Sequence, residues 1–225
     1  MNCLRSLEYI KKIDNKYKKY GLKTILIHSP EWEFEKNSNN VLRAAKQYHI
    51  KIPIIIDKDK KIIKKLKINF WPTQILIKNN RIIYKHIGEG NYKKLENKIR
   101  AILKIKSNAV FNNEPKYTKF QTIYAGKKKG GGSLDKKGHW KQNNEFLEGK
   151  GFLTLKTKGN IISLVAKSIS NKPINVKIKV DNKLIKKMKI NEPQLYKVVE
   201  LKNNKSRTLT IETKSKIAVY SFAFQ

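Results

Sequence analysis

The sequence has little cysteine and no long hydrophobic run. Cys3 is the one cysteine in 225 residues, which excludes an internal disulfide and any zinc site built from several cysteines. The longest apolar run, residues 52–56, is far shorter than the roughly 18 residues that span a bilayer. No signal-peptide pattern opens the chain. These absences exclude disulfide-rich, multi-cysteine zinc and membrane-channel classes of protein.

Acidic residues are also scarce, with 17 Asp+Glu against 51 Lys+Arg and a formal net charge of +34. Such a surface attracts polyanions, which leaves salt-sensitive polyanion binding as one alternative. Proteins that recognise specific nucleic-acid sequences, however, favour the bidentate guanidinium group of arginine, and this chain has only five arginines. Its lysines are spread along the whole chain. We therefore expect a lysine-rich solvated surface and no specific nucleic-acid binding.

Residues 1–106 alternate helical and strand patterns. Apolar residues that recur every three or four positions predict a first helix that ends at Gly21. The apolar runs at residues 24–28 and 53–56 predict two buried strands. Asp59 is expected to cap a short helix, and Asn79-Asn80 is expected to turn a hairpin. A closing helix follows at residues 92–105. This order predicts an α/β domain with a mixed sheet.

The rest of the chain has a different character. Residues 107–138 lose periodicity and are expected to form a linker or a crossing loop. Residues 139–225 carry only short strand signals, several of which alternate apolar with lysine or threonine. About seven such strands predict a β-sandwich of jelly-roll or immunoglobulin-like type.

Three segments of the first part together suggest a family. Residues 2–7 read Asn-Cys-Leu-Arg-Ser-Leu at a helix start, residues 28–35 read His-Ser-Pro-Glu-Trp-Glu-Phe-Glu after a strand, and residues 70–73 read Phe-Trp-Pro-Thr. Their order resembles the thioredoxin-like domain of the DipZ type, close to the TlpA group of extracytoplasmic thiol:disulfide proteins. The resemblance covers residues 2–104. The later strands resemble that family's C-terminal jelly roll, which is similar to carbohydrate-binding modules.

The resemblance implies dithiol–disulfide exchange with thiol- or disulfide-containing proteins. In such domains a Cys-x-x-Cys pair lies at a helix N-terminus, where the helix dipole and free N–H groups stabilise a thiolate. Cys3 matches the second, resolving cysteine of that pair. Pro72, after Trp71, matches the family's cis-proline, which presents backbone to a docked partner chain. Cytochrome c maturation and general periplasmic disulfide reduction are both implied targets.

The sequence departs from the family pattern at its start. The first cysteine and the strand before it are expected to lie ahead of Met1, so the chain is expected to be an N-terminally truncated piece of a longer protein. The strands near residues 24–28 and 73–77 are then expected to have unpaired edges. A membrane-embedded electron-donating part and an extracytoplasmic location are implied for the intact protein. Whether this chain is itself an active enzyme stays open.

Each candidate residue also has a plainer interpretation. Cys3 could be a thiol of no consequence, and Trp71 could be core. His28 near three glutamates has unconvincing spacing for a metal site, so no metal is expected. The segment around Glu89 lacks the spacing of a phosphate loop, and no cofactor is expected.

The second part offers an alternative function. Trp140, Phe146 and Tyr196 could form a platform on which sugars stack, which would make the chain a non-catalytic protein- or glycan-binding module. The alternating aromatic residues 220, 222 and 224 are expected to pack in the core.

Overall fold

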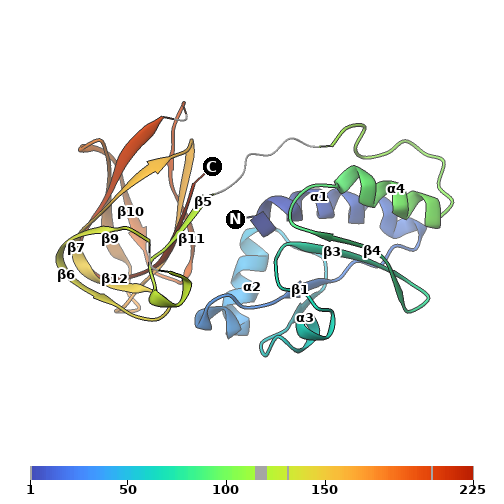
Figure 1. The fold of residues 1–225 in the computed structure, drawn as a ribbon, viewed down its shortest axis with the longest axis horizontal. Coiled ribbons are helices and arrows are strands. Elements are labelled where there is room, and N and C mark those ends of the chain that lie inside the picture. Colours follow the sequence, from blue (N-terminus) through green and yellow to red (C-terminus); the bar gives the residue numbers. More distant parts are fainter. Residues whose placement is uncertain (1, 115–120, 131, 204, 225) are drawn as a thin grey trace. The chain divides into compact units, whose positions relative to one another are not determined.

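The computed structural model describes residues 2–114, 121–130, 132–203 and 205–224. The chain divides into two compact units, residues 1–117 and 118–225. Each unit has its own core, and each is described here by itself (Figure 1).

The first unit alternates helices with short strands. Its elements, in chain order, are α1 (Asn2–Tyr17), the 3₁₀ turn η1 (Lys18–Tyr20), β1 (Leu26–His28), the 3₁₀ turn η2 (Glu33–Lys36), α2 (Ser38–Gln47), β2 (Ile54–Ile56), α3 (Lys61–Lys65), β3 (Thr73–Lys78), β4 (Arg81–Ile87) and α4 (Tyr92–Ile102).

Helices α1 and α4 pack together over one face of the β3–β4 hairpin, as Figure 1 shows. Their apolar stripes recur every three or four residues, which directs them to one side of each helix. Tyr9 of α1 stacks on Tyr92 of α4 with 4.4 Å between ring centroids. The buried residues of this core are Ile13, Tyr17, Tyr92, Leu95, Ile99 and Phe111.

The strands of the first unit form two separate pairs. Strands β1 and β2 pair in parallel, and β3 and β4 form an antiparallel hairpin. Asn79 and Asn80 both take left-handed backbone angles at the hairpin turn, as their sequence predicts. Among the described residues no ladder joins the two pairs, which agrees with the expected unpaired edges.

The start of α3 corrects one prediction. Asp59 was expected to cap this helix. The N-cap residue of the helix is instead Lys60, whose side chain makes no capping hydrogen bond. Instead, the carboxylate of Asp57 accepts hydrogen bonds from the amides of Ile62 and Ile63, at 3.1 and 3.0 Å. The chain turns after β2 so that the earlier aspartate reaches the free N–H groups.

The second unit is all β, as predicted. Its elements are β5 (Gln121–Tyr124), the 3₁₀ turn η3 (Lys127–Lys129), β6 (Asp135–Gln142), β7 (Leu147–Lys158), β8 (Ile161–Ser168), β9 (Ile174–Val180), β10 (Lys183–Ile190), β11 (Gln194–Glu200) and β12 (Ser206–Phe224).

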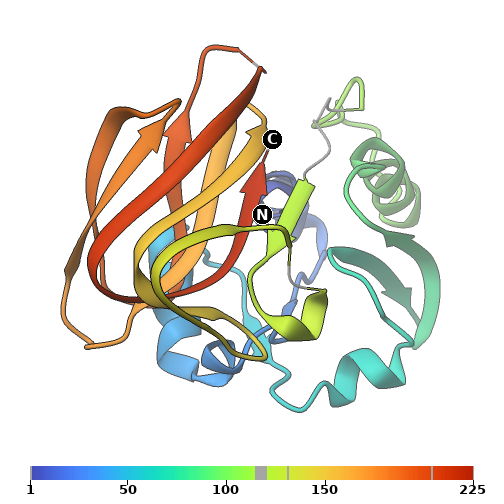
Figure 2. The same ribbon diagram turned by 60° about the vertical axis from the view of Figure 1, so that its left-hand side comes forward.

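Strand β12 organises this unit. Its first part pairs with β7 and β9, residues 217–219 pair with β7 and β8, and residues 221–224 pair with β8 and β5. Figure 2 shows β12 as the long red ribbon that bends between these partners. Alternate side chains point inward and build one core, in which Phe222 and Phe224 are buried as expected.

Residues 107–138, which were expected to form a linker or an ordered crossing loop, contribute to both units. Phe111 is buried against α1 and α4 in the first unit. Strand β5 and the beginning of β6 lie in the second unit. Residues 115–120 and 131 lie outside the described residues. Loss of periodicity therefore did not mark an absence of structure here, because β5 is paired with β12, far along the sequence.

Candidate functional site

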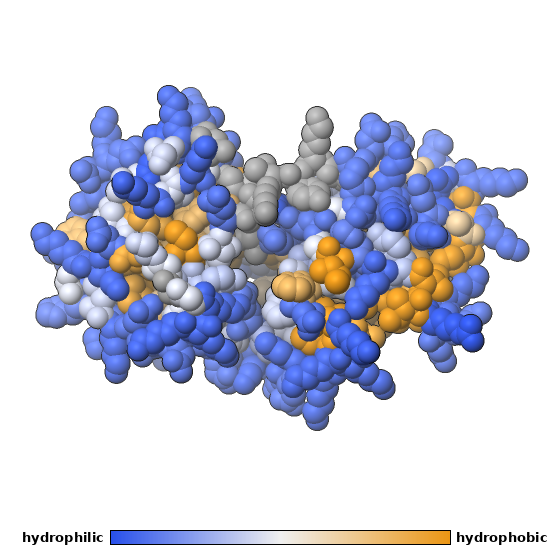
Figure 3. Space-filling model, in the orientation of Figure 1, coloured by the Kyte–Doolittle hydropathy of each residue, from blue (hydrophilic) through white to orange (hydrophobic). Residues whose placement is uncertain are grey.

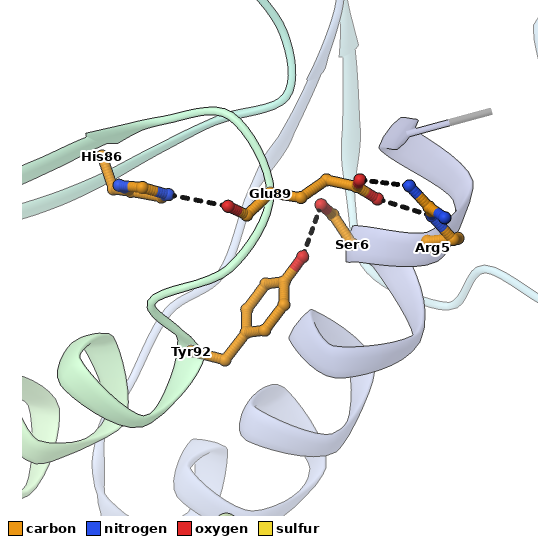
Figure 4. Close-up of polar contacts among 5 residues, drawn as sticks. All are labelled: Arg5, Ser6, His86, Glu89 and Tyr92. Carbon is orange, nitrogen blue, oxygen red and sulfur yellow. Dashed lines mark hydrogen bonds and ion pairs between the residues drawn. The ribbon is translucent and has the colours of Figure 1, made fainter. Parts of the chain in front are cut away.

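The first turn of α1 carries Cys3 and two residues that attach the helix to the loop after β4. The Arg5 guanidinium contacts the Glu89 carboxylate at two points, with 2.8 Å between Nε and Oε1 (Figure 4). The side chains are mostly buried, with 19% and 8% exposed. A bidentate ion pair of this kind fixes the relative orientation of its two side chains and also contributes electrostatic attraction.

A second contact lies beside this ion pair. The hydroxyl groups of Ser6 and Tyr92 are buried and 2.7 Å apart, so α1 is also joined to the start of α4. His86 donates from Nε2 to the Glu89 carbonyl at 3.1 Å (Figure 4). It also accepts a hydrogen bond from the side chain of Asn91. The loop between β4 and α4 is therefore held from both sides.

The loop after β1 places two more carboxylates near the start of α1. The Glu35 carboxylate accepts from the amides of Glu31 and Trp32, at 2.5 and 3.3 Å. Trp32 stacks on Phe34 with 5.9 Å between centroids. These bonds close the 3₁₀ turn on itself and leave the loop acidic.

Cys3 lies in a setting that disfavours its thiolate. The residue keeps exposed surface, yet desolvation by the surrounding protein raises the pKa of its thiol from an ordinary 9.0 to about 11. The carboxylates of Glu31, Glu35 and Glu89 raise the pKa further. The resemblance implied a thiolate stabilised by the helix, whereas these surrounding groups favour the neutral thiol.

Trp71 and Pro72 form a bend before β3. Their peptide bond is cis, as the resemblance implied. Trp71 is 37% exposed, and the ammonium group of Lys60 lies 5.7 Å from its ring centroid. The Pro72 carbonyl accepts from the Gly88 amide at 2.8 Å. The bend is therefore bonded to the loop that carries Glu89, which is the loop that Arg5 holds.

The structure thus connects the predicted site residues through the loop that carries Gly88 and Glu89. Arg5 lies in a segment that suggested the family, and Glu89 lies in the segment without phosphate-loop spacing, but nothing in the sequence pairs them across 84 positions. Their opposite charges were the only available signal.

His28 behaves as a structural residue. Its Nε2 lies 3.2 Å from the Glu35 carbonyl, and desolvation lowers the pKa of its ring. Within the described ranges, no three His, Cys, Asp or Glu side chains gather in the manner of metal ligands. No helix in the same residues has the length and apolar character to cross a bilayer.

The aromatic residues suggested for sugar stacking each pack against protein. Trp140 is partly buried on the core of the second unit, and its Nε1 donates to the Lys137 carbonyl at 3.3 Å. The ring centroids of Phe146 and Tyr220 lie 5.2 Å apart. The Tyr196 hydroxyl donates to the Glu192 carbonyl at 2.7 Å. Glycan binding stays a prediction.

Comparison with protein families covers almost the whole chain. Residues 2–103 match the family model described as Redoxin, and residues 103–224 match the one described as Thioredoxin like C-terminal domain. The predicted resemblance is therefore confirmed for both parts.

Two curated relatives match the chain over about 100 residues. Protein DipZ of Mycobacterium bovis is 32% identical over 105 residues, which is 46% of this chain and 15% of that protein. Thiol-disulfide oxidoreductase ResA of Bacillus cereus is 33% identical over 101 residues, which is 44% of this chain and 56% of that protein. The chain spans less than two thirds of either relative.

A solved carbohydrate esterase of family two from Cellvibrio japonicus is also similar, at 15% identity and a TM-score of 0.41. The match covers 47% of this chain and 33% of that one.

Proposed function

Because this chain belongs to the family described as Thioredoxin like C-terminal domain, and its first unit is of the redoxin type, we propose that its chemistry is thiol–disulfide exchange. Cys3 is the reacting residue of this proposal. The Redoxin match begins at residue 2 and so includes Cys3. The DipZ and ResA relatives support the same chemistry, since the latter is named for it.

One observation carries the proposal: Cys3 stands in the first turn of a helix that is bonded to the loop beside Pro72. Arg5 holds that loop through Glu89, and Gly88 in the same loop donates to the Pro72 carbonyl. A sulfur at this place reacts at the surface while the helix beneath it stays fixed.

The reaction balances with one thiol from this chain. The Cys3 thiolate attacks one sulfur of a partner's disulfide, a new sulfur–sulfur bond forms, and the partner's other sulfur leaves as a thiolate that takes up a proton. A thiol of a dithiol reductant then attacks the partner's sulfur in the mixed disulfide, which forms a disulfide between reductant and partner and releases the Cys3 thiolate. The second thiol of the reductant breaks that disulfide, so the partner leaves with both sulfurs reduced and the reductant leaves as a disulfide. The two electrons come from that reductant. Cys3 lies at the place that the resemblance gives to the resolving cysteine.

The proposed partners are proteins that carry thiols or disulfides. They would meet the exposed bend that Trp71 and Pro72 form, next to Phe70, which is 68% exposed. We place this function outside the cytoplasm, with electrons supplied by a membrane-embedded partner domain, in cytochrome c maturation or general disulfide reduction. This placement is the one that the resemblance to the DipZ and TlpA type implies.

Formation of a mixed disulfide tests the proposal. The reduced full chain is mixed with oxidised glutathione from about pH 7 to about pH 11, and the adduct is followed by mass spectrometry. We expect a rate that is low near neutral pH and rises until the pH reaches the thiol pKa of about 11. Turnover of insulin disulfides with dithiothreitol is expected to be negligible, since the chain has one cysteine.

Two controls make the result decisive. Cys3→Ser should form no adduct at any pH. The wild-type chain unfolded in urea should react with the pH dependence of an ordinary thiol. Reaction of the unfolded chain together with complete silence of the folded chain, even at high pH, would refute a reactive role for Cys3.

A further inference from the structure

The second unit exposes two neighbouring aliphatic side chains on strand β10. Leu184 and Ile185, which form the aliphatic pair, are 49% and 52% exposed. Among the described residues of this unit, Phe152 is the one other large hydrophobic residue that is exposed, at 37%. Figure 3 has the orientation of Figure 1, and on the face that it shows, the second unit is mostly hydrophilic with hydrophobic residues in small areas. Single apolar residues on a surface are ordinary, but an adjacent pair leaves continuous apolar surface in water.

The aliphatic pair lies at a corner of the sheet. Strand β10 is an edge strand, since β9 is its one pairing partner among the described residues. The turn Asp181-Asn182 joins the two strands with left-handed backbone angles, and the pair follows one residue later. The register shifts between Leu184 and Lys186, so Ile185 is an extra residue with no opposite partner in the ladder. A corner of this kind presents its side chains outward.

Lysines share the outer face with Leu184. This residue stands opposite Lys179, whose ammonium group lies 5.6 Å from the ring centroid of Phe152. Lys187 stands opposite Lys177 in the same ladder. Directly opposite residues share one face of a sheet, and this face points away from the core, because the isoleucine between the two lysines of β9 is fully buried. The exposed apolar residues and these lysines therefore form one surface.

The surface has more cations than anions. Lys183 and Lys186 flank the aliphatic pair in the sequence and are exposed, so the lysine cluster of this corner consists of Lys177, Lys179, Lys183, Lys186 and Lys187. Glu212 binds the two lysines of β9, at 3.0 and 2.8 Å, and Asp181 pairs with Arg207 at 3.2 Å. Within the described ranges, no carboxylate forms an ion pair with the three lysines of β10. The corner is therefore positively charged.

Three kinds of partner would meet this corner differently. A soluble polyanion would neutralise the lysine cluster but leave the aliphatic pair in water. A second copy of the chain, paired corner to corner, would bring like charges together. An anionic lipid bilayer matches both features, because its headgroups attract lysine and its acyl boundary takes up aliphatic side chains.

We propose that this corner of the second unit binds the surface of an anionic lipid bilayer. The aliphatic pair enters the boundary between headgroups and acyl chains, and the lysine cluster lies against the headgroups. One signal alone gives weak, reversible attachment, whereas an apolar anchor beside a basic patch gives stable attachment. The binding uses no residue of the first unit, so it is independent of the proposed thiol chemistry.

Sedimentation of the full chain with lipid vesicles tests the proposal. Vesicles of phosphatidylcholine alone are compared with vesicles of phosphatidylcholine and phosphatidylglycerol in equal parts. Binding to the anionic vesicles should be at least about tenfold stronger, and it should weaken when sodium chloride is raised from about 0.1 M to about 1 M. Cys3→Ser should bind as the wild type does.

Substitution of the aliphatic pair separates the corner from the basic surface as a whole. Leu184→Ser with Ile185→Ser keeps the net charge and should weaken vesicle binding at least about tenfold. Both residues are exposed, so the fold should be retained, which circular dichroism checks. Ile82→Ser with Ile83→Ser is the matched control, since that exposed pair also follows a two-residue turn. This control should change binding less than about twofold.

A second pair of variants tests the lysine cluster. Changing Lys183, Lys186 and Lys187 to glutamine should weaken binding to the anionic vesicles at least about tenfold. The control changes Lys136, Lys137 and Lys141 to glutamine. These lysines are exposed on β6, at the other end of the same sheet, and the net charge falls equally. The control should weaken binding less than about threefold.

A dye at the corner reports entry into the bilayer. Leu184→Cys in a Cys3→Ser background is labelled with a dye whose fluorescence rises in apolar surroundings, and its fluorescence should rise on anionic vesicles. The same dye at Lys136→Cys should not respond. Inorganic polyphosphate should bind the wild type and the variant without the aliphatic pair alike, because it buries no apolar surface.

Three outcomes would overturn the proposal. The first is equal loss of vesicle binding in a variant of the corner and in its matched control, which would assign the binding to the basic surface at large. The second is a dye at position 184 that stays in water while the chain is bound. The third is a dimer that forms without lipid and is lost with the aliphatic pair, since a second copy would then be the occupant.

Discussion

Arg5 and Glu89 form a two-point ion pair that joins the first turn of α1 to the loop between β4 and α4. The pair is largely shielded from water, and its two members lie 84 positions apart in the chain. Because Gly88 of the same loop bonds to Pro72, the pair also determines where Cys3 stands relative to the bend before β3.

Removal of Arg5 should destabilise the first unit. Arg5→Ala leaves the Glu89 carboxylate mostly buried without its cation, which costs about 1–3 kcal/mol. Urea unfolding, followed by circular dichroism, measures the loss. Glu8→Ala is the matched control on the same helix: the Glu8 side chain is 62% exposed, and its pair with Lys11 should contribute less than about 0.5 kcal/mol. Equal losses for both variants would contradict the role given to the Arg5–Glu89 pair.

The reactivity of Cys3 should respond to the acidic loop after β1. Glu31→Gln removes a negative charge that raises the thiol pKa, so the pKa should fall from about 11 and a larger fraction of thiolate should exist at any lower pH. At about pH 8, alkylation by iodoacetamide should be about twofold to tenfold faster.

Glu33→Gln serves as the control for this experiment. Glu33 lies in the same loop and is paired with Lys36, but it is not among the groups that shift Cys3. Its substitution should leave the alkylation profile unchanged. A profile that moves equally for both variants would show that the loop conformation, rather than the charge of Glu31, controls the thiol.

Glu96 should hold the segment after α4 in place. Its carboxylate is fully buried and accepts from the Tyr17 hydroxyl at 2.5 Å, from the Val110 amide and from the Phe111 amide at 2.9 Å. Glu96→Gln turns one acceptor into a donor that faces an N–H, at a cost of about 1–3 kcal/mol.

Hydrogen exchange measures this effect directly. The amides of Val110 and Phe111 should exchange faster in Glu96→Gln than in the wild type. Lys98→Gln, on the exposed side of the same helix, should change neither the exchange nor the stability. Protection that survives in Glu96→Gln would mean that packing of Phe111 alone holds the segment.

Gly149 should be required in the second unit. A Cβ at this position would lie 2.1 Å from the His139 carbonyl oxygen and 2.7 Å from a ring carbon of Trp140. Backbone cannot move aside cheaply, so Gly149→Ala should cost at least about 1–3 kcal/mol and alter the fluorescence of Trp140. Lys150 is the next residue of the strand and is exposed, so Lys150→Ala should change neither the stability nor the fluorescence. A stable Gly149→Ala variant with unchanged fluorescence would contradict this packing.

Local patterns in the sequence predicted much of the fold. Gly21 ends the first helical segment with a φ of 95°, and Asn79-Asn80 turns the β3–β4 hairpin. Both depend on residues a few positions apart, whose steric preferences act within one turn. The prediction that Asp59 caps α3 was wrong because the capping contact is not local. Asp57 lies in the preceding loop, and only the path of that loop brings its carboxylate to the amides of α3.

The sequence by itself determined the order of helices and strands, the change from an α/β part to an all-β part, and the residues that suggest the redox family. The tertiary structure alone decided the surroundings of those residues: which carboxylates act on Cys3 and which loop Arg5 holds. Hydrophobic periodicity is a property of neighbours in the chain. Charge coupling and edge pairing depend on distances between segments tens of residues apart, and only the folded chain sets those distances.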